Sequence, residues 1–170
     1  MTPQVPWIFL YRDPEEVLAS HFNPTEWKSN NVVCLQERSN PSSLTYQVAK
    51  EQGKTLSKMS DAEFCAVRLA SLCLAAIQEH TTTKHGHFFN YNTLPGSMWE
   101  SILPKYFGVD VNSRMIEQMK EISGVYSKGR ASNTREWHDD EKQAGLSDEQ
   151  REAAHKILEP YHIKMEELVS

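Results

Sequence analysis

Two polar side chains near the start of the chain have the types and the spacing to bind an anion. Arg12 follows the apolar run from Trp7 to Tyr11, and Ser20 comes eight residues after it. A guanidinium offers a fork of donors that fits a phosphate, and a serine hydroxyl can donate one more hydrogen bond. The pair therefore predicts a phosphate site. The alternative is that Arg12 pairs with Asp13 or another nearby carboxylate.

The residues around this pair predict a strand followed by a helix. Residues 7–11 are aromatic and aliphatic, which is typical of a buried strand. Asp13 can cap a helix, Pro14 suits its first position, and two glutamates follow where the helix dipole favours carboxylates. Arg12 is thus expected at the carboxyl end of a strand, where open α/β sheets bind ligands.

A second strand is expected about 75 residues later, after a buried helix. Ser60 and Glu63 form a capping box ahead of a densely apolar stretch that runs to His80, which predicts a helix buried on most sides. Residues 87–91 predict a short strand parallel to the first, so that the helix is a βαβ crossover. Tyr91 at its end can stack on a purine ring, and core packing is the alternative.

A basic loop is the second candidate anion site. Residues 126–135 combine small residues with three cations, and successive backbone donors in such a loop can form a concave anion site. The candidate binding residues of this loop are Ser127, Lys128, Gly129 and Arg130. The alternative is a solvated loop without a ligand.

The other segments predict one long loop and further helices. Residues 23–60 are rich in Asn, Ser, Pro and Lys and are interpreted as a loop with short helical pieces, either a lid or a variable loop. Pro95 is expected in the first turn of a helix, whereas Pro104 and Pro160 are expected to kink or end theirs. Helices are predicted over 93–107, 111–122 and 147–168.

The composition indicates one domain and limits the classes of partner. The chain has 170 residues, of which 39% are hydrophobic and 24% charged, an ordinary composition for a single folded domain. Its net charge of -5 argues against a nucleic-acid surface. No run approaches the roughly 20 apolar residues of a membrane span, and the first residues lack signal-peptide features, so a cytoplasmic location is expected.

The cysteines and histidines predict neither a disulfide framework nor a metal site. Cys34, Cys65 and Cys73 are an odd number without a short paired spacing, which favours a reducing compartment. The last two are expected to act as small core residues. Three histidines between residues 80 and 87 have no carboxylate or thiol at a useful spacing, so no metal ligand is assigned.

Three of these segments resemble, in order, parts of sulfotransferases that use 3′-phosphoadenosine 5′-phosphosulfate (PAPS). Residues 9–20 resemble the strand and helix whose arginine and serine hold the 3′-phosphate. Residues 91–94, Tyr-Asn-Thr-Leu, resemble the Tyr-Glu-Asp-Leu segment near the adenine, with both acids replaced. Lys128 and Gly129 match the Arg-Lys-Gly loop that closes over the 3′-phosphate, Ser127 stands in place of its arginine, and Arg130 can substitute.

The resemblance implies a fold class and a domain. The expected fold is α/β, a partial three-layer parallel sheet of the sulfotransferase type, which is like that of P-loop nucleoside triphosphate hydrolases. It is expected to be mostly helical with two or few strands. Residues 1–170 would form a single partial domain, equivalent to the carboxyl-terminal half of a sulfotransferase.

The resemblance also implies a co-substrate and its binding residues. The chain is expected to bind the 3′-phosphoadenosine part of PAPS without a metal. The implied nucleotide-binding residues are Arg12, Ser20, Tyr91, Ser127, Lys128, Gly129 and Arg130.

The resemblance does not extend to the catalytic parts of the family. Full-length relatives transfer a sulfuryl group to a hydroxyl or amine acceptor. Their 5′-phosphosulfate loop and catalytic base have no counterpart here, so no catalytic residue and no acceptor are assigned, and the chain by itself is expected to be inactive. The alternative is a non-catalytic helical interaction module, or a remnant that binds no nucleotide.

Overall fold

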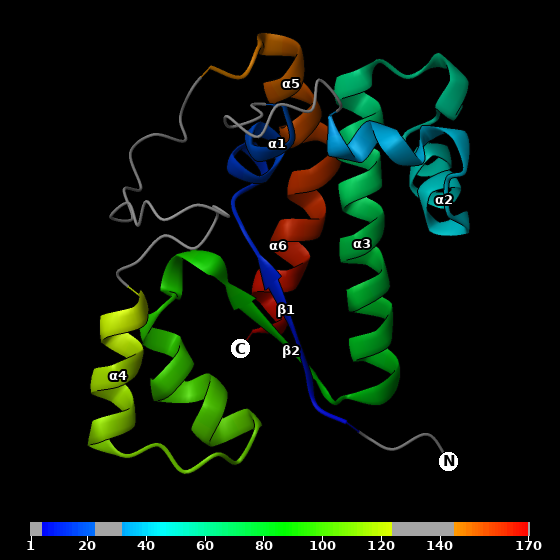
Figure 1. The fold of residues 1–170 in the computed structure, drawn as a ribbon. Helices are drawn as coiled ribbons and strands as arrows, with labels where there is room; N and C mark the ends of the chain where they lie inside the picture. The colour runs from blue at the N-terminus through cyan, green and yellow to red at the C-terminus, as the bar shows by residue number, and fades with distance from the viewer. Residues whose placement is uncertain (1–4, 23–31, 124–144, 170) are drawn as a thin grey trace. The chain divides into compact units, whose positions relative to one another are not determined.

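The computed structural model describes residues 5–22, 32–123 and 145–169 (Figure 1). These residues belong to two compact units. Unit 1 comprises Met1–Phe89 and Lys142–Ser170, and unit 2 comprises Asn90–Glu141.

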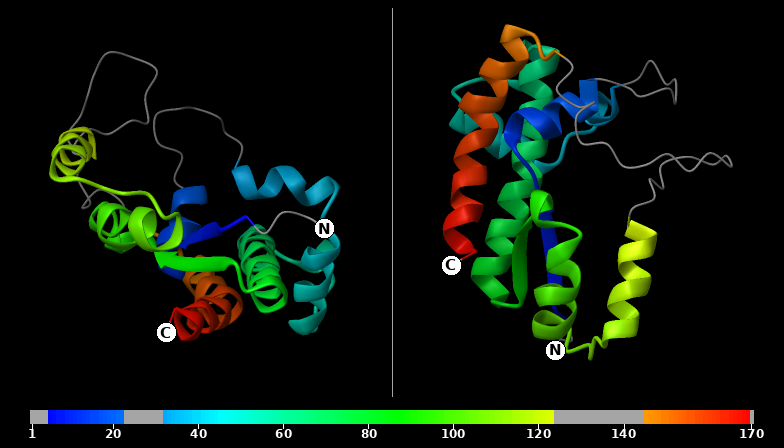
Figure 2. Two further views of the ribbon diagram at one scale, coloured as in Figure 1. Left: turned by 90° about the horizontal axis from the view of Figure 1, so that it is seen from below. Right: turned by 90° about the vertical axis from the view of Figure 1, so that its left-hand side faces the viewer.

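Unit 1 is built from one small sheet and a set of helices. Helices α3 and α6 lie on the same face of the sheet (Figure 2). In chain order the elements are β1 (Trp7–Tyr11), α1 (Pro14–Phe22), η1 (Val33–Ser39), α2 (Ser43–Glu51), η2 (Leu56–Lys58), α3 (Asp61–Thr83), β2 (Gly86–Asn90), α5 (Asp148–Ala153), η6 (Ala154–Leu158) and α6 (Glu159–Leu168).

The described residues form a sheet of two parallel strands, β1 and β2. The predicted first strand is confirmed, whereas the second begins one residue earlier than predicted and ends before Tyr91. On the inner face, the rings of Trp7 and Phe9 each form an edge-to-face pair with the ring of Phe88, with centroids 6.2 Å apart. With its two parallel strands and mostly helical remainder, the chain is compatible with the α/β class.

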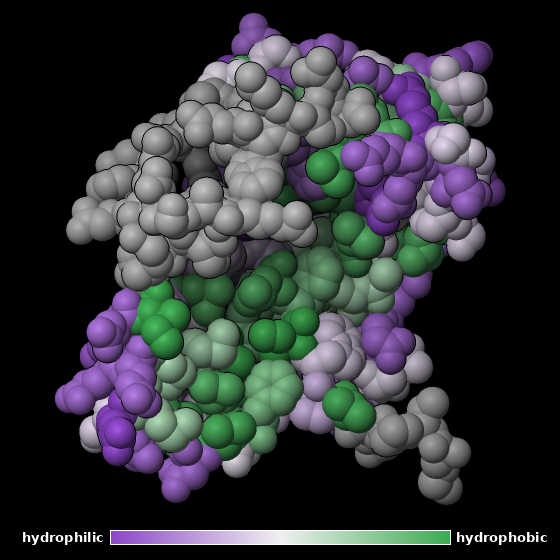
Figure 3. Space-filling view, in the orientation of Figure 1, coloured by the Kyte–Doolittle hydropathy of each residue, from purple (hydrophilic) through white to green (hydrophobic). Residues whose placement is uncertain are grey.

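The outer face of β1 also carries apolar side chains. Leu10 points away from the core and keeps 42% of its surface exposed. Figure 3 shows apolar residues along the course of β1, in the same orientation as Figure 1. The apolar run from Trp7 to Tyr11 therefore reflects a strand with apolar residues on both faces, of which the inner one lies in the core.

The long helix α3 forms the centre of the unit 1 core, as its apolar sequence predicts. Ser60 accepts a hydrogen bond from the backbone of Glu63, whose side chain accepts one from the backbone of Ser60, so the predicted capping box is confirmed. Phe64 and Val67 are fully buried on this helix. The helix ends at Thr83 and is capped by Lys84, which adopts a left-handed conformation with φ of 59°.

Short helical pieces are present in the described part of the segment 23–60. Helix α2 buries Val48 and Ala49 in the same core as α3. The hydroxyl groups of Thr45 and Ser71 lie 3.2 Å apart and connect the two helices through a buried hydrogen bond. Residues 32–60 thus contribute to the core of unit 1, and residues 23–31 lie outside the described residues.

The predicted carboxyl-terminal helix is also confirmed, with a change of geometry in its middle. Ser147 and Gln150 form a capping box at its start. The helix widens into π geometry over η6 and returns to α geometry at Glu159, directly before Pro160. Because proline lacks an N–H and its ring crowds the preceding turn, the wider turn ahead of Pro160 accommodates it.

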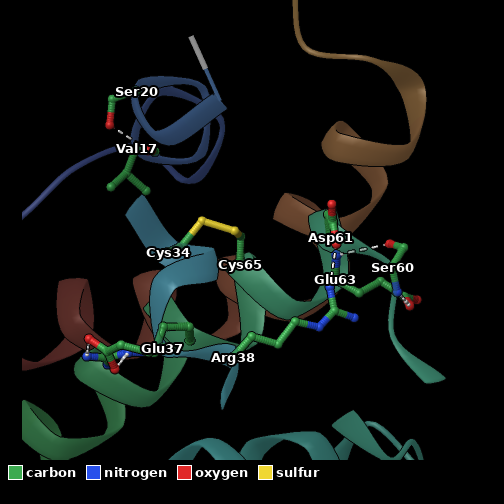
Figure 4. Close-up of a disulfide and its surroundings, with 10 residues drawn as sticks. Val17, Ser20, Cys34, Glu37, Arg38, Ser60, Asp61, Glu63 and Cys65 are labelled. Carbon is green, nitrogen blue, oxygen red and sulfur yellow. Dashed lines mark hydrogen bonds and ion pairs between the residues drawn. A yellow bond between two sulfur atoms is a disulfide. The ribbon is translucent and has the colours of Figure 1, made fainter. Parts of the chain in front are cut away.

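A disulfide between Cys34 and Cys65 corrects the prediction that the cysteines are unpaired (Figure 4). Their Cα atoms are 5.2 Å apart although the residues are separated by 31 positions, so no short spacing could indicate the pair. The bond joins η1 to α3. Cys73 is the free cysteine, and burial raises the pKa of its thiol to about 12, which agrees with the core role expected for it.

Charged contacts reinforce the connection between η1 and α3. Arg38 contacts the Asp61 carboxylate and lies over the ring of Phe64, 5.1 Å from its centroid. Arg68 on α3 binds Glu37 through two nitrogens, and its Nη2 donates to the Glu37 carboxylate at 2.7 Å. The disulfide is therefore one of several contacts between these two elements.

Unit 2 contains η3 (Tyr91–Thr93), η4 (Met98–Tyr106) and α4 (Ser113–Ser123). Pro95 lies one position before the helical turn in which it was predicted, because the first helical residues are Gly96 and Ser97, directly ahead of η4. The carbonyl of Pro95 accepts a hydrogen bond from the backbone N–H of Met98 at 3.0 Å. Pro104 lies within η4, whose π geometry tolerates the missing N–H. The predicted helix over 111–122 is confirmed as α4.

Within the described ranges, no helix is long and apolar enough to span a membrane.

Removing the disulfide should reduce the stability of unit 1. A chain with Cys34→Ala and Cys65→Ala should lose about 3 to 4 kcal/mol of unfolding free energy, because the bond closes a loop of roughly 30 residues. Urea denaturation measures the difference, and Cys73→Ala, which keeps the disulfide, is the control. Non-reducing peptide mapping that finds Cys34 and Cys65 as free thiols would contradict the pairing.

Candidate anion site

Arg12 lies between the carboxyl end of β1 and the first turn of α1, as predicted. The carboxylate of Asp13 accepts hydrogen bonds from the backbone N–H groups of Glu15 at 2.9 Å and Glu16 at 3.1 Å. Asp13 is therefore the predicted helix cap, and Pro14 begins the helix. The local sequence thus places the guanidinium of Arg12 beside the start of α1.

The side chain of Arg12 binds a carboxylate in the first turn of α1. Its Nε donates a hydrogen bond to Glu16 at 2.5 Å, and only 14% of the Arg12 side chain is exposed. Pairing with a nearby carboxylate was the alternative to a phosphate site. The partner is Glu16 rather than Asp13, because the Asp13 carboxylate caps the helix.

Ser20 lies one helical turn beyond Glu16 on α1. Residues four apart in a helix share a face, so Glu16 lies between Arg12 and Ser20 on the same side of α1. The Ser20 hydroxyl is exposed and donates to the backbone carbonyl of Val17 at 2.7 Å (Figure 4). This bond is local, and rotation about one side-chain torsion frees the hydroxyl for another acceptor.

The other predicted nucleotide-binding residues belong to unit 2 or lie outside the described residues. Tyr91 opens η3 in unit 2 and is half-buried there. Ser127, Lys128, Gly129 and Arg130 lie outside the described residues. The site that the structure describes therefore consists of Arg12, Glu16 and Ser20 with the capping carboxylate.

A second set of charged residues, which the sequence analysis missed, surrounds the neighbouring Glu15. The Nε2 of His155 lies 2.7 Å from the Glu15 carboxylate, and its Nδ1 lies 3.1 Å from that of Glu159. Arg151 approaches Glu15 at 3.6 Å. The spacing of four residues could have indicated the contact between His155 and Glu159. No local pattern could have indicated the contact with Glu15, which lies 140 positions from His155 in the chain.

A buried tyrosine ends β1 on the inner side of the sheet. The hydroxyl of Tyr11 donates to Glu166 on α6 at 2.7 Å, and His162 packs edge-on against its ring. Burial, followed by the hydrogen bond to Glu166, raises the pKa of Tyr11. Tyr11 therefore keeps its proton and connects the end of the strand beside Arg12 to the carboxyl-terminal helix.

The described residues hold no group of three or more His, Cys, Asp or Glu side chains that could ligate a metal ion. In the predicted histidine segment, the Nδ1 of His80 lies 2.7 Å from the carbonyl oxygen of Gly86. Because a carbonyl only accepts, this nitrogen carries the ring proton and connects the end of α3 to the start of β2.

No family model, curated protein or solved structure matches this chain. A function is therefore inferred from the residues of the anion site and their surroundings.

The His155 contacts should give this side chain a pKa above its ordinary value of 6.5, because Glu159 and Glu15 both accept hydrogen bonds from the charged ring. A raised folded-state pKa means that the stabilisation is complete below about pH 6.5 and is lost as the pH rises through the folded value. NMR titration of the ring protons measures the midpoint. Glu159→Gln and Glu15→Gln should each lower it, and Glu149→Gln should not. A midpoint at or below 6.5 in the unmodified chain would contradict the contacts.

Proposed function

We propose that this chain binds the 3′-phosphoadenosine part of PAPS, with Arg12 and Ser20 holding the 3′-phosphate. The observation that carries the proposal is the position of Arg12 at the carboxyl end of a parallel strand, on the same side of α1 as Ser20. Anions bind at this edge of α/β sheets because strand ends and helix starts leave donors there. The proposed fold is the partial three-layer sheet of the sulfotransferase type.

The side chains rather than the helix backbone would supply the donors. The first-turn N–H groups of Glu15 and Glu16 already donate to Asp13, so they are committed to the cap. The guanidinium of Arg12 can present two parallel N–H donors to phosphate oxygens, and Ser20 can add one O–H donor. This set fits a terminal phosphate monoester such as the 3′-phosphate.

The remaining residues of the proposed site would complete the nucleotide pocket. Tyr91 is proposed to stack on the adenine, and the loop of Ser127, Lys128, Gly129 and Arg130 is proposed to close over the phosphate. No residue is assigned as the catalytic base, and the acceptor is not assigned. The proposal is therefore nucleotide binding in a sulfotransferase-like domain, without sulfuryl transfer by this chain alone.

The disulfide bears on where such a protein would fold. A cytoplasmic location was expected from the sequence. The Cys34–Cys65 bond argues instead for an oxidising compartment, because cytosolic thiols are kept reduced. We propose that the chain folds where disulfides persist.

A second candidate function is a non-catalytic helical interaction module. The observation that favours it is the ion pair between Arg12 and Glu16, which gives the arginine a structural partner without any ligand. Under this alternative the charged residues of α1 only connect helices to one another, as Glu15 does through His155.

Isothermal titration with 3′-phosphoadenosine 5′-phosphate separates the two candidates. The chain should bind it saturably, and Arg12→Ala should weaken binding at least about tenfold, because a charge-assisted hydrogen bond contributes about 1.5 to 3 kcal/mol. Ser20→Ala should have a smaller effect in the same direction. Arg114→Ala on α4 is the matched control, and adenosine 5′-phosphate tests the need for the 3′-phosphate.

Two results would count against nucleotide binding. The first is the absence of saturable binding by a chain that melts cooperatively, which would support the interaction module. The second is equal weakening by Arg12→Ala and Arg114→Ala, which would show that the overall charge rather than the site determines affinity.

Sulfuryl transfer by the purified chain is expected to be undetectable, because no general base or donor for the 5′ end is assigned. The measurement is incubation with PAPS and a mixed set of hydroxyl and amine acceptors, followed by mass spectrometry for sulfated products. Sulfation above the level of heat-denatured protein would contradict this expectation.

A further inference from the structure

We infer that Glu16 is a built-in competitor that occupies Arg12 in the free chain and must release it before an anion binds. This inference rests on the proposed function of the Arg12 site. The carboxylate of Glu16 lies 2.5 Å from the Nε of Arg12, and Nε–H is one of the five donors of the guanidinium that the proposed phosphate would bind. The pair is partly buried, with 14% of the Arg12 and 32% of the Glu16 side chain exposed.

The position of Glu16 makes simultaneous binding unfavourable. Glu16 lies one helical turn before Ser20 and on the same side of α1, so its carboxylate stands where an anion would contact both Arg12 and Ser20. A phosphate carries two negative charges near neutral pH, and a carboxylate beside it would repel it at short range. The bound state therefore requires Glu16 to rotate away from Arg12.

Glu15 offers a matched comparison within the same helical turn. It is the same residue type with the same charge, but it contacts His155 at 2.7 Å and Arg151 at 3.6 Å. These contacts direct its carboxylate to the carboxyl-terminal helices, whereas the carboxylate of Glu16 binds Arg12. A competitor effect should therefore be specific to Glu16, whereas a general effect of negative charge should be shared by both glutamates.

The expected gain follows from the fraction of chains in which Arg12 is available. An ion pair of this exposure is open in a minority of the chains, and the competition by Glu16 raises the apparent dissociation constant by the inverse of that fraction. Glu16→Gln should therefore tighten binding about two- to sixfold. Glu15→Gln should change it less than about twofold.

The experiment is isothermal titration of the full chain with 3′-phosphoadenosine 5′-phosphate for the unmodified protein, Glu16→Gln, Glu15→Gln, and Glu16→Gln combined with Arg12→Ala. Thermal melts check that each variant folds, and Glu16→Ala provides a second variant without the competing carboxylate. The NMR signal of the Arg12 Nε–Hε group reports the exchange of partners directly. It should shift on addition of nucleotide in the unmodified chain, and on the Glu16→Gln substitution without nucleotide.

The outcomes separate this inference from the proposed function. Tighter binding in Glu16→Gln only, abolished by Arg12→Ala, supports the competitor. Binding by the unmodified chain that is unchanged or weaker in Glu16→Gln and Glu16→Ala overturns the competitor while the proposed function stands. An equal gain in Glu15→Gln also overturns it, because net charge would then be the cause. Absence of binding in all variants overturns the proposed function and the competitor together.

Discussion

The burial of α3 is the constraint on which the rest of unit 1 depends. A helix with apolar residues on most of its circumference is stable in water only when other elements cover it. Helix α3 shares one core with the sheet and with α6, η1 and α2. Its residues Phe64 and Val67 are fully buried in that core. Each such side chain contributes about 1.5 to 3 kcal/mol relative to exposure, so the arrangement of these elements follows from covering this one helix.

The candidate site is a consequence of that packing. The inner face of β1 lies in the core through Trp7, Phe9 and Tyr11, and this fixes where the strand ends. Tyr11 then bonds to Glu166 on α6, so the residue before Arg12 is held by both the core and a hydrogen bond. Arg12 therefore emerges at a fixed point, and the Asp13 cap sets the direction in which α1 leaves it.

The charges of α1 are divided between two sets of partners. Glu15 is bound by cations from the carboxyl-terminal segment, and Glu16 is bound by Arg12 from the strand end. Adjacent positions in a helix point about 100° apart, which explains why two neighbouring glutamates serve different partners. An arginine that already has a carboxylate partner can still bind an anion, but the anion must compete for it.

The sequence by itself determined the elements whose signals are local. The predictions for the cap residues Asp13 and Ser60, for the apolar helix α3 and for the aromatic strand before Arg12 were confirmed. Each of these signals depends on neighbours within one or two turns. The position of Arg12 at the end of a strand was predictable for the same reason. The sequence limited the alternative partners of Arg12 to nearby carboxylates. The structure shows that the partner is Glu16, because the Asp13 carboxylate caps the helix.

Only the tertiary structure decided the contacts between residues far apart in the chain. The Cys34–Cys65 disulfide, the bond between Tyr11 and Glu166, and the contact between Glu15 and His155 join residues 31, 155 and 140 positions apart. No local pattern indicates such pairs, because each depends on how several helices pack around α3. The sequence thus determined where the candidate anion site begins, and the packing decided which charges surround it.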